Sequence, residues 1–371
     1  MSLMQTLRTH LATVQDIPFV DFMHLALYAP NEGYYSSGLH KLGQHGDFIT
    51  APELTPLFGK TLANQCQQIL TSLDAPVVLE YGAGTGRLCV DVLSHLEQLN
   101  GLPETYFILE VSANLRQRQQ ELVQQELPPH LAQRVKWLDG WPQTPFNGVI
   151  LANEVLDAMP VHRFMQTEQG VMESFVALDA QGALIERFKP CNNQRLLAYI
   201  KQHLPQNSLP YLSEANLFLD DWLANNYQVL NQGAMLLIDY GFPRHEYYHP
   251  DRNQGTLMCH YRHQAHPSPL LYPGEQDITA HVDFTHVAEA AQQAGFHVAG
   301  YTNQASFLLG NGLLDFMNTE DDEPKQVRAK QAIKQLTHPS EMGELFKVIA
   351  LCKNIEIDLN GFQLQDKRVS L

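Results

Sequence analysis

The stretch from Val77 to Gly86 limits most strongly what this chain can fold into. It reads Val-Val-Leu-Glu-Tyr-Gly-Ala-Gly-Thr-Gly, which is a short apolar run, an acid and three glycines in alternate positions. This pattern predicts a buried parallel strand, a tight turn and the start of a helix, the unit in which α/β proteins bind adenosine cofactors. Gly82, Gly84 and Gly86 have no Cβ, so each can adopt a positive φ and let the backbone approach a ligand.

The residues around this turn support the same interpretation. The helix expected after the glycines has an apolar face that can pack on a sheet. The glycine spacing differs from the dinucleotide fingerprint G-x-G-x-x-G, and Glu80 at the end of the strand is the more informative residue. A tight strand-to-helix connection that binds no ligand is the alternative interpretation of the glycines alone.

Length and charge limit the class of protein. With 371 residues, 44% of them apolar, the chain can form one large α/β domain with additions, or two domains that share a cleft. The formal net charge of -16 argues against a nucleic-acid partner, because phosphate binding requires clustered Lys and Arg. The negative charge suits cationic ligands, although a solubilising surface explains most of it.

The five cysteines are scattered and never form a C-x-x-C pair, so we expect reduced packing residues of an intracellular protein. The N-terminus has neither the apolar core of a signal peptide nor the composition of a transit peptide. No apolar run reaches membrane-spanning length. The sequence therefore predicts a soluble, cytoplasmic protein without a membrane span.

A long glycine-rich segment follows the N-terminal helical pattern of residues 3–28. It extends from Pro30 to Asp47 and contains the adjacent residues Tyr34 and Tyr35. Loops of this length in a compact domain are usually functional or disordered, and the aromatic pair favours order. Asp47 is a candidate cofactor ligand, because it is a loop acid beside the expected glycine turn.

The next helix is expected to begin at a capping box. Thr50 to Glu53 has the form of such a box, with Pro early in a helix that continues towards Leu73. Glu53 is therefore interpreted as a structural cap, with a catalytic acid as the alternative.

Two further strands end next to acids. Tyr106 to Val111 predicts the second strand, and Glu110 stands near its end, 24 residues beyond Gly86. Because this strand lies beside the first in the expected topology, Glu110 can accept hydrogen bonds from the ribose hydroxyls. The third strand is expected at Val135 to Leu138, and Asp139 after it could accept from an adenine amino group. A surface acid is the alternative for Glu110.

The fourth strand, Gly148 to Ala152, leads directly into a group of polar residues. Asn153, Glu154 and Asp157 follow the carboxyl end of this central strand, where open α/β sheets place their chemistry. The alternatives are structural: Asp157 could cap a following helix, and Glu154 could pair with a surface arginine such as Arg163.

The rest of the chain completes a seven-stranded, mostly parallel sheet. Its further strands are expected at Ala234 to Ile238, about Phe296 to Tyr301, and Phe346 to Cys352. The predicted division is a lid (1–74), a sheet domain (75–160 and 231–371) and an inserted α+β subdomain (161–230). Three regularly spaced histidines suggest a metal site. No Cys or acid completes a ligand set, so no metal is expected. These are His260, His263 and His266.

The ordered set of motifs resembles the MidA-type methyltransferases, and Glu-x-Gly-x-Gly-x-Gly resembles motif I of Rossmann-like enzymes that bind S-adenosylmethionine (SAM). The likeness covers nearly the whole chain, and the joint occurrence in this order is highly specific. The family includes the mitochondrial complex I assembly factor that dimethylates an arginine. The motifs are Tyr28 to Tyr35, Gly46 to Glu53, Glu80 to Gly86, Asn153 to Pro160, Asp239 to Gly241 and His281 to Phe284.

The resemblance implies a class I, Rossmann-like SAM-dependent methyltransferase that forms symmetric dimethylarginine on a protein such as a respiratory complex I subunit. It also implies roles for the matching residues. The methionine part of SAM would be held by Glu80, Gly82, Gly84 and Gly86, its ribose by Glu110, and the acceptor by Asn153, Glu154 and Asp157.

The chemistry of the acceptor fits these residue types. A guanidinium is a poor nucleophile, so carboxylates such as Glu154 and Asp157 must orient it, and Asn153 can accept an N–H without adding charge. Other acceptors remain open, namely glutamine, lysine or a small molecule. A non-catalytic assembly chaperone that retains SAM binding and a nicotinamide dehydrogenase are further alternatives. Apolar positions in the insertion suit a homodimer as well as a substrate.

Overall fold

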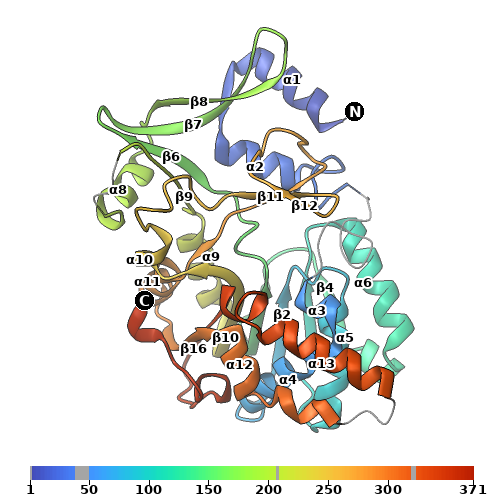
Figure 1. Ribbon diagram of the computed structural model, residues 1–371. Coiled ribbons are helices and arrows are strands. Elements are labelled where there is room, and N and C mark those ends of the chain that lie inside the picture. Colours follow the sequence, from blue (N-terminus) through green and yellow to red (C-terminus); the bar gives the residue numbers. More distant parts are fainter. Residues whose placement is uncertain (1, 38–49, 206–208, 319–322) are drawn as a thin grey trace.

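The computed structural model describes residues 2–37, 50–205, 209–318 and 323–371. Figure 1 shows two parts: a lower α/β part around a central sheet, and an upper layer of small sheets and N-terminal helices. None of the helices in these described ranges has the length and apolar character needed to cross a membrane.

The central sheet has seven strands in the order β15-β16-β10-β5-β2-β3-β4. All run parallel except β16, which is antiparallel to both of its neighbours. The expected seven-stranded, mostly parallel sheet is thus confirmed, and short β14 (Val282–Asp283) pairs with the end of β10. In sheet order the strands are β15 (His297–Asn303), β16 (Phe346–Lys353), β10 (Leu230–Phe242), β5 (Phe146–Asn153), β2 (Val77–Tyr81), β3 (Thr105–Leu109) and β4 (Val135–Leu138).

The central sheet is buried on both faces. In β2, Val78 packs in the core on one face and Leu79 in the core on the other, because successive side chains of a strand alternate. This double burial explains why the strands read as continuous apolar runs. The first face carries α4 (Pro56–Leu70), α5 (Arg87–Gln98), α6 (Ala113–Glu126), α12 (Gln304–Gly310) and α13 (Glu323–Thr337). The second face carries α9 (Leu219–Val229) and α11 (Phe284–Ala294).

The expected single helix from Thr50 towards Leu73 is wrong. The structure has α3 (Ala51–Leu54), an extended Thr55 and then α4, because Pro56 cannot donate the hydrogen bond that would continue α3. The side chain of Thr50 makes no capping hydrogen bond, so the expected capping box is also wrong. The carboxylate of Glu53 instead accepts a hydrogen bond from the Thr85 hydroxyl in the glycine turn.

The upper layer is assembled from three segments that are far apart in the sequence. Strand β1 pairs with β7 of the insertion, and one hydrophobic core joins α1 and α2 to residues such as Val176 and Ile278. Its elements are α1 (Leu3–Val14), β1 (Asp16–Pro18), α2 (Phe19–Tyr28), β6 (His162–Thr167), β7 (Gly170–Leu178), β8 (Leu184–Pro190), α8 (Gln194–His203), β9 (Tyr211–Ala215), β11 (Met258–Tyr261), β12 (Gln264–His266) and β13 (Asp277–Thr279). Short helices complete the chain: α7 (Pro129–Ala132), α10 (Arg244–Tyr247), α14 (Met342–Leu345), η1 (Leu313–Asn318), η2 (Asn360–Phe362) and η3 (Arg368–Ser370).

The packing differs from the predicted division at three places. Helices α3 and α4, placed in a lid of residues 1–74, pack on the central sheet. Helix α9, placed in the insertion of 161–230, covers the other face of that sheet. Strands β11 to β13, placed within 231–371, belong to the upper layer. These assignments depend on long-range pairing, which local patterns do not contain.

Candidate active site

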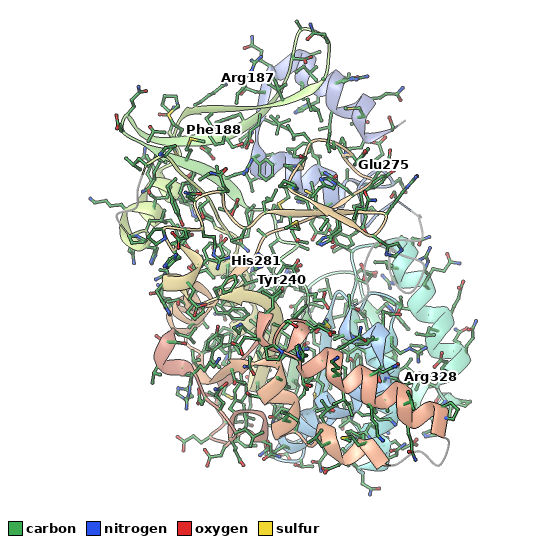
Figure 2. The ribbon with its side chains drawn as sticks, in the orientation of Figure 1. Arg187, Phe188, Tyr240, Glu275, His281 and Arg328 are labelled. Carbon is green, nitrogen blue, oxygen red and sulfur yellow. The ribbon has the colours of Figure 1, made fainter. Side chains whose placement is uncertain are left out.

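A cavity of about 1010 Å³ lies between the carboxyl ends of the central strands and the upper layer. Tyr240 and His281, which both line it, lie at this junction in Figure 2. Most of the predicted site residues reach it. Those that line the cavity are Glu80, Gly82, Gly84, Glu110, Asn153, Glu154 and Asp157.

Two predicted site residues within the described ranges, Asp139 and Gly86, do not line the cavity. A third, Asp47, lies outside the described residues. The Asp139 side chain is 90% exposed and pairs with Arg116, so the structure does not bring it to the cavity. Gly86 is the N-cap residue of α5 and packs against α6. A Cβ on Gly86 would lie 3.2 Å from the Gln119 Cα.

The glycine turn has the predicted backbone conformation. Gly82, Gly84 and Gly86 have φ angles of +59°, +54° and +93°, which L side chains rarely adopt. The N–H of Gly82 donates to the carbonyl of Leu109 at 3.1 Å, which fixes the turn against the end of β3. The α5 N-terminus follows directly, and its free N–H groups favour a negatively polarised ligand.

Glu80 lies at the base of the turn and is only 3% exposed. The Tyr106 hydroxyl donates to its carboxyl at 2.8 Å. Burial raises the pKa of Glu80 to about 8, although the hydrogen bond from Tyr106 opposes this rise. A cationic ligand group beside Glu80 would favour its ionised form.

Gln119 is a residue that the sequence interpretation missed. Its amide donates to the Glu110 carboxylate at 3.0 Å and to the Gly84 carbonyl at 2.9 Å. Its carbonyl accepts from the Trp137 indole N–H at 2.9 Å. A signal was present, because Gln119 interrupts the apolar stripe of α6 between Leu115 and Val123. Gln119 therefore links Glu110, the residue expected to bind the ribose, to the glycine turn through hydrogen bonds.

Trp141 also lines the cavity, and its ring lies edge-on to Tyr81 with 5.9 Å between the ring centroids. Trp141 follows Asp139 by two residues, and Trp141 rather than Asp139 lines the cavity.

The loop after β5 has a strained backbone at its first residue. Glu154 has a φ of +54°, and its N–H donates to the Ile238 carbonyl at 2.9 Å. The buried Asp239 on β10 holds the next three residues, because one of its oxygens accepts their backbone N–H groups. The donors are Val155, Leu156 and Asp157, at 3.2, 2.9 and 3.3 Å.

The pKa values of both acids on this loop are raised. Burial and then the charge of Asp157 raise the pKa of Glu154 to about 8. Burial also raises the pKa of Asp157 to about 6, against a hydrogen bond from the Tyr240 hydroxyl. The structural alternatives do not hold: Arg163 pairs with Glu186, and no helix begins after Asp157.

Two buried oxygens on this loop have no hydrogen-bond partner among the described residues. They are Oδ1 of Asn153, whose amide nitrogen donates to Glu154 at 3.1 Å, and Oδ1 of Asp157. Asp157 is 5% exposed. Because buried acceptors are normally satisfied, this end of the cavity suits a ligand with several N–H donors.

Comparison with known proteins identifies the family to which the chain belongs. Residues 61–302 match Methyltransf_28, described as "Putative S-adenosyl-L-methionine-dependent methyltransferase". The chain belongs to this family. The resemblance to SAM-dependent methyltransferases is thereby confirmed, and SAM is the cofactor of this methyltransferase.

The methyltransferase is also similar to individual proteins over nearly its whole length. A COG1565 superfamily member from Burkholderia thailandensis, solved with S-adenosyl-homocysteine bound, is 42% identical with a TM-score of 0.94, covering 100% of this chain and 96% of that one. The protein arginine methyltransferase NDUFAF7 of Mus musculus is 29% identical over 366 residues, which is 90% of this chain and 80% of that protein. The Homo sapiens protein of the same name is 27% identical over 94% of this chain and 82% of its own length.

The residues present fit this cofactor. The glycine turn has no Cβ where the ligand approaches, and Glu110 is a buried acceptor held in place by Gln119 and the Ser112 N–H. Glu80, Gly82 and Gly84 would hold the methionine part and Glu110 the ribose. Among the described residues, no three His, Cys, Asp or Glu side chains are placed to hold a metal ion.

Proposed function

We propose that this methyltransferase methylates arginine side chains of a partner protein. The observation that carries the proposal is the unpartnered, buried Oδ1 of Asp157 near Glu154, on the loop after β5 that lines the cavity. An arginine guanidinium offers five N–H donors, a positive charge and no acceptor. It therefore matches a site that holds buried acids and free acceptor oxygens.

The cofactor supplies an electrophilic methyl group, and the residues of the chain hold the nucleophile. Glu154 and Asp157 can form charge-assisted hydrogen bonds to a guanidinium, whose charge favours the ionised acids. Such bonds orient the terminal nitrogen and exclude water, so alignment lowers the barrier. Glu154, with a pKa of about 8, can take up the proton that the guanidinium loses after transfer.

The relatives support the same acceptor. The proteins named protein arginine methyltransferase NDUFAF7 are similar to this chain over nine tenths of its length, at 27 to 29% identity in mouse and human. A subunit of respiratory complex I, implied by the resemblance, is the first protein acceptor to test. Symmetric dimethylarginine is the expected product.

Mass spectrometry of a candidate acceptor, incubated with the purified protein and isotope-labelled SAM, tests the proposal. We expect labelled dimethylarginine with the wild type and at least about a hundredfold less with Glu154→Gln, because an interaction made at the reacting group is lost. Glu168→Gln is the matched control, since Glu168 lies exposed in the turn after β6. Both variants should bind S-adenosylhomocysteine like the wild type.

Two results would contradict the proposal. Label on lysine, glutamine or a small molecule would retain the methyltransferase and replace its acceptor. Tight binding of the partner without any methylation, unchanged in Glu154→Gln, would favour a non-catalytic assembly role.

A further inference from the structure

The upper layer brings a further buried acid to the cavity, which the sequence interpretation did not single out. Asp277 on β13 lines the cavity and is 1% exposed. The Tyr35 hydroxyl donates to its Oδ1 at 2.9 Å, and the N–H of Ile278 donates to the same oxygen at 3.0 Å. The orientation of this carboxyl is therefore fixed from two sides.

Two tyrosine rings form a wall beside Asp277. The rings of Tyr28 and Tyr35 stack with 5.6 Å between their centroids and 23° between their planes, and both line the cavity. The Tyr28 hydroxyl donates to the Ala158 carbonyl at 2.9 Å, next to Asp157. This wall thus connects the upper layer to the loop that carries the acceptor-side acids.

Electrostatics shows that these groups act on one another across the cavity. The pKa of Glu154 is raised by burial, then by Asp157, and to a smaller extent by Asp277. Burial and then Asp277 raise the pKa of Tyr28, and Asp157 adds to the effect. The backbone joins the two sides as well, because the N–H of Ala280, three residues after Asp277, donates to the Asp157 carbonyl at 3.0 Å. Asp277 and the loop after β5 therefore face one cavity.

We infer that Asp277 and the Tyr28–Tyr35 wall form the second half of the acceptor pocket, so that a guanidinium is held between the central sheet and the upper layer. This inference rests on the proposed function and specifies how the acceptor is selected. A planar cation can lie against the tyrosine rings while acids bind its edges. A neutral amide of similar shape brings no positive charge to the acids that line this pocket, which discriminates against it.

Within this pocket, Tyr35 is a positioning residue that acts through Asp277. Its hydroxyl fixes the carboxyl and need not contact the acceptor. Removing the Tyr35 hydroxyl should weaken acceptor binding only while Asp277 is present. The losses of affinity from substituting Tyr35 and Asp277 should therefore not be additive.

Calorimetric titration of the protein saturated with S-adenosylhomocysteine tests the inference. The probes are the peptide Gly-Arg-Gly and its citrulline counterpart, which has nearly the same shape without the charge. We expect the wild type to bind the arginine peptide more tightly, and Asp277→Asn to lose about tenfold of that affinity with little change for citrulline. Tyr35→Phe should lose less, and nothing further when combined with Asp277→Asn.

Glu275→Gln is the matched control. Glu275 lies two residues from Asp277 but is exposed, and Figure 2 shows it at the outer edge of the upper layer. This variant should retain the wild-type preference for arginine. Circular dichroism and thermal unfolding check that each variant has folded, and titration of each cofactor-free protein with S-adenosylhomocysteine checks its cofactor side. Tyr35→Phe still tests the inference if Asp277→Asn does not fold.

The results that would overturn the proposed function differ from those that would overturn only this inference. If the wild type does not distinguish arginine from citrulline, the proposed function is wrong and this inference falls with it. If the wild type distinguishes them and Asp277→Asn does so equally well, only the inference is overturned. It is also overturned if folded Asp277→Asn loses affinity for S-adenosylhomocysteine, because Asp277 would then belong to the cofactor side.

Discussion

One oxygen of Asp239 lies 2.9 Å from the backbone nitrogen of Leu156. The same oxygen accepts the N–H groups of the residues on either side, and the other oxygen accepts the N–H of Tyr240 at 2.9 Å. Asp239 belongs to β10 and Leu156 to the loop after β5, so the contact joins neighbouring strands. A single buried carboxyl thereby sets the path of the loop that holds Glu154 in a left-handed conformation.

Replacing Asp239 by Leu should destabilise the protein by about 3 kcal/mol, because four backbone N–H donors lose their acceptor. Asp239→Asn should cost much less. Burial raises the pKa of Asp239 well above its ordinary value, and a neutral amide still offers one acceptor oxygen. Denaturant-induced unfolding of the two variants measures the difference, and equal losses would show that the hydrogen bonds are not what matters.

Gly84→Asp should abolish binding of S-adenosylhomocysteine, since a carboxylate would enter the turn at a φ of +54°. Gly182→Asp is a suitable control, because Gly182 also has a positive φ, of +78°, in an open turn far from the cavity. Calorimetric titration should show normal affinity for the control. Normal affinity in both variants would place the cofactor elsewhere.

Gln119→Leu should weaken S-adenosylhomocysteine binding about tenfold, because the carboxylate of Glu110 and the turn at Gly84 both lose a donor. Gln117→Leu, on the exposed side of the same helix, is the matched control. A ribose-free fragment such as methionine should lose less affinity than the whole cofactor product. Equal losses would contradict the link through Glu110.

The pH dependence of kcat/KM for the acceptor should report the buried acids. Their pKa values are raised, to about 6 for Asp157 and about 8 for Glu154, and only the ionised forms hold a cation. The rate should therefore rise as pH increases through both values. In Glu154→Gln the residual activity should rise through about pH 6 only. If Glu154→Gln still shows the rise in kcat/KM near pH 8, a group other than Glu154 causes that rise.

Glu80 makes stability depend on pH. Its pKa is about 8 in the folded protein against an ordinary 4.5, so between these values the folded state binds more protons than the unfolded chain. The free energy of unfolding must then fall as pH rises across this window, by at most about 1.4 kcal/mol per pH unit from this group. Glu80→Gln should show a shallower fall in melting temperature from pH 5 to 8 than the wild type or Glu168→Gln.

The central sheet was predictable because burial on both faces turns its strands into apolar runs, and because helix periodicity between them is strong. The site on this sheet was predictable for a related reason: carboxyl ends of parallel strands meet at one edge, so Glu80, Glu110 and Glu154 converge on one cavity. Short-range contacts also fix two helix starts, because the side chains of Ser112 and Asp283 accept the N–H groups of Leu115 and His286.

The features of the site that the sequence did not predict depend on contacts between segments far apart in the chain. Asp277 reaches the cavity only because β13 packs with α2 in the upper layer, and nothing near it in the sequence indicates that contact. Asp139 followed the strand-end rule, but its side chain turns towards Arg116 on α6. Strand ends therefore locate the edge of the sheet, while side-chain direction is decided by neighbours that local patterns do not contain.

Strand β16 is the last strand of the chain, yet it lies inside the sheet, hydrogen-bonded to β10 and β15. A growing chain leaves the ribosome with β10 long before β16, so one edge of β10 stays open while the segment between the two strands is made. Asp239 and Tyr240 belong to that strand. The cavity that Tyr240 lines can therefore take its final form only after β16 has emerged and paired, and protection of the open edge by chaperones would matter more for this chain than for one whose sheet grows outward strand by strand.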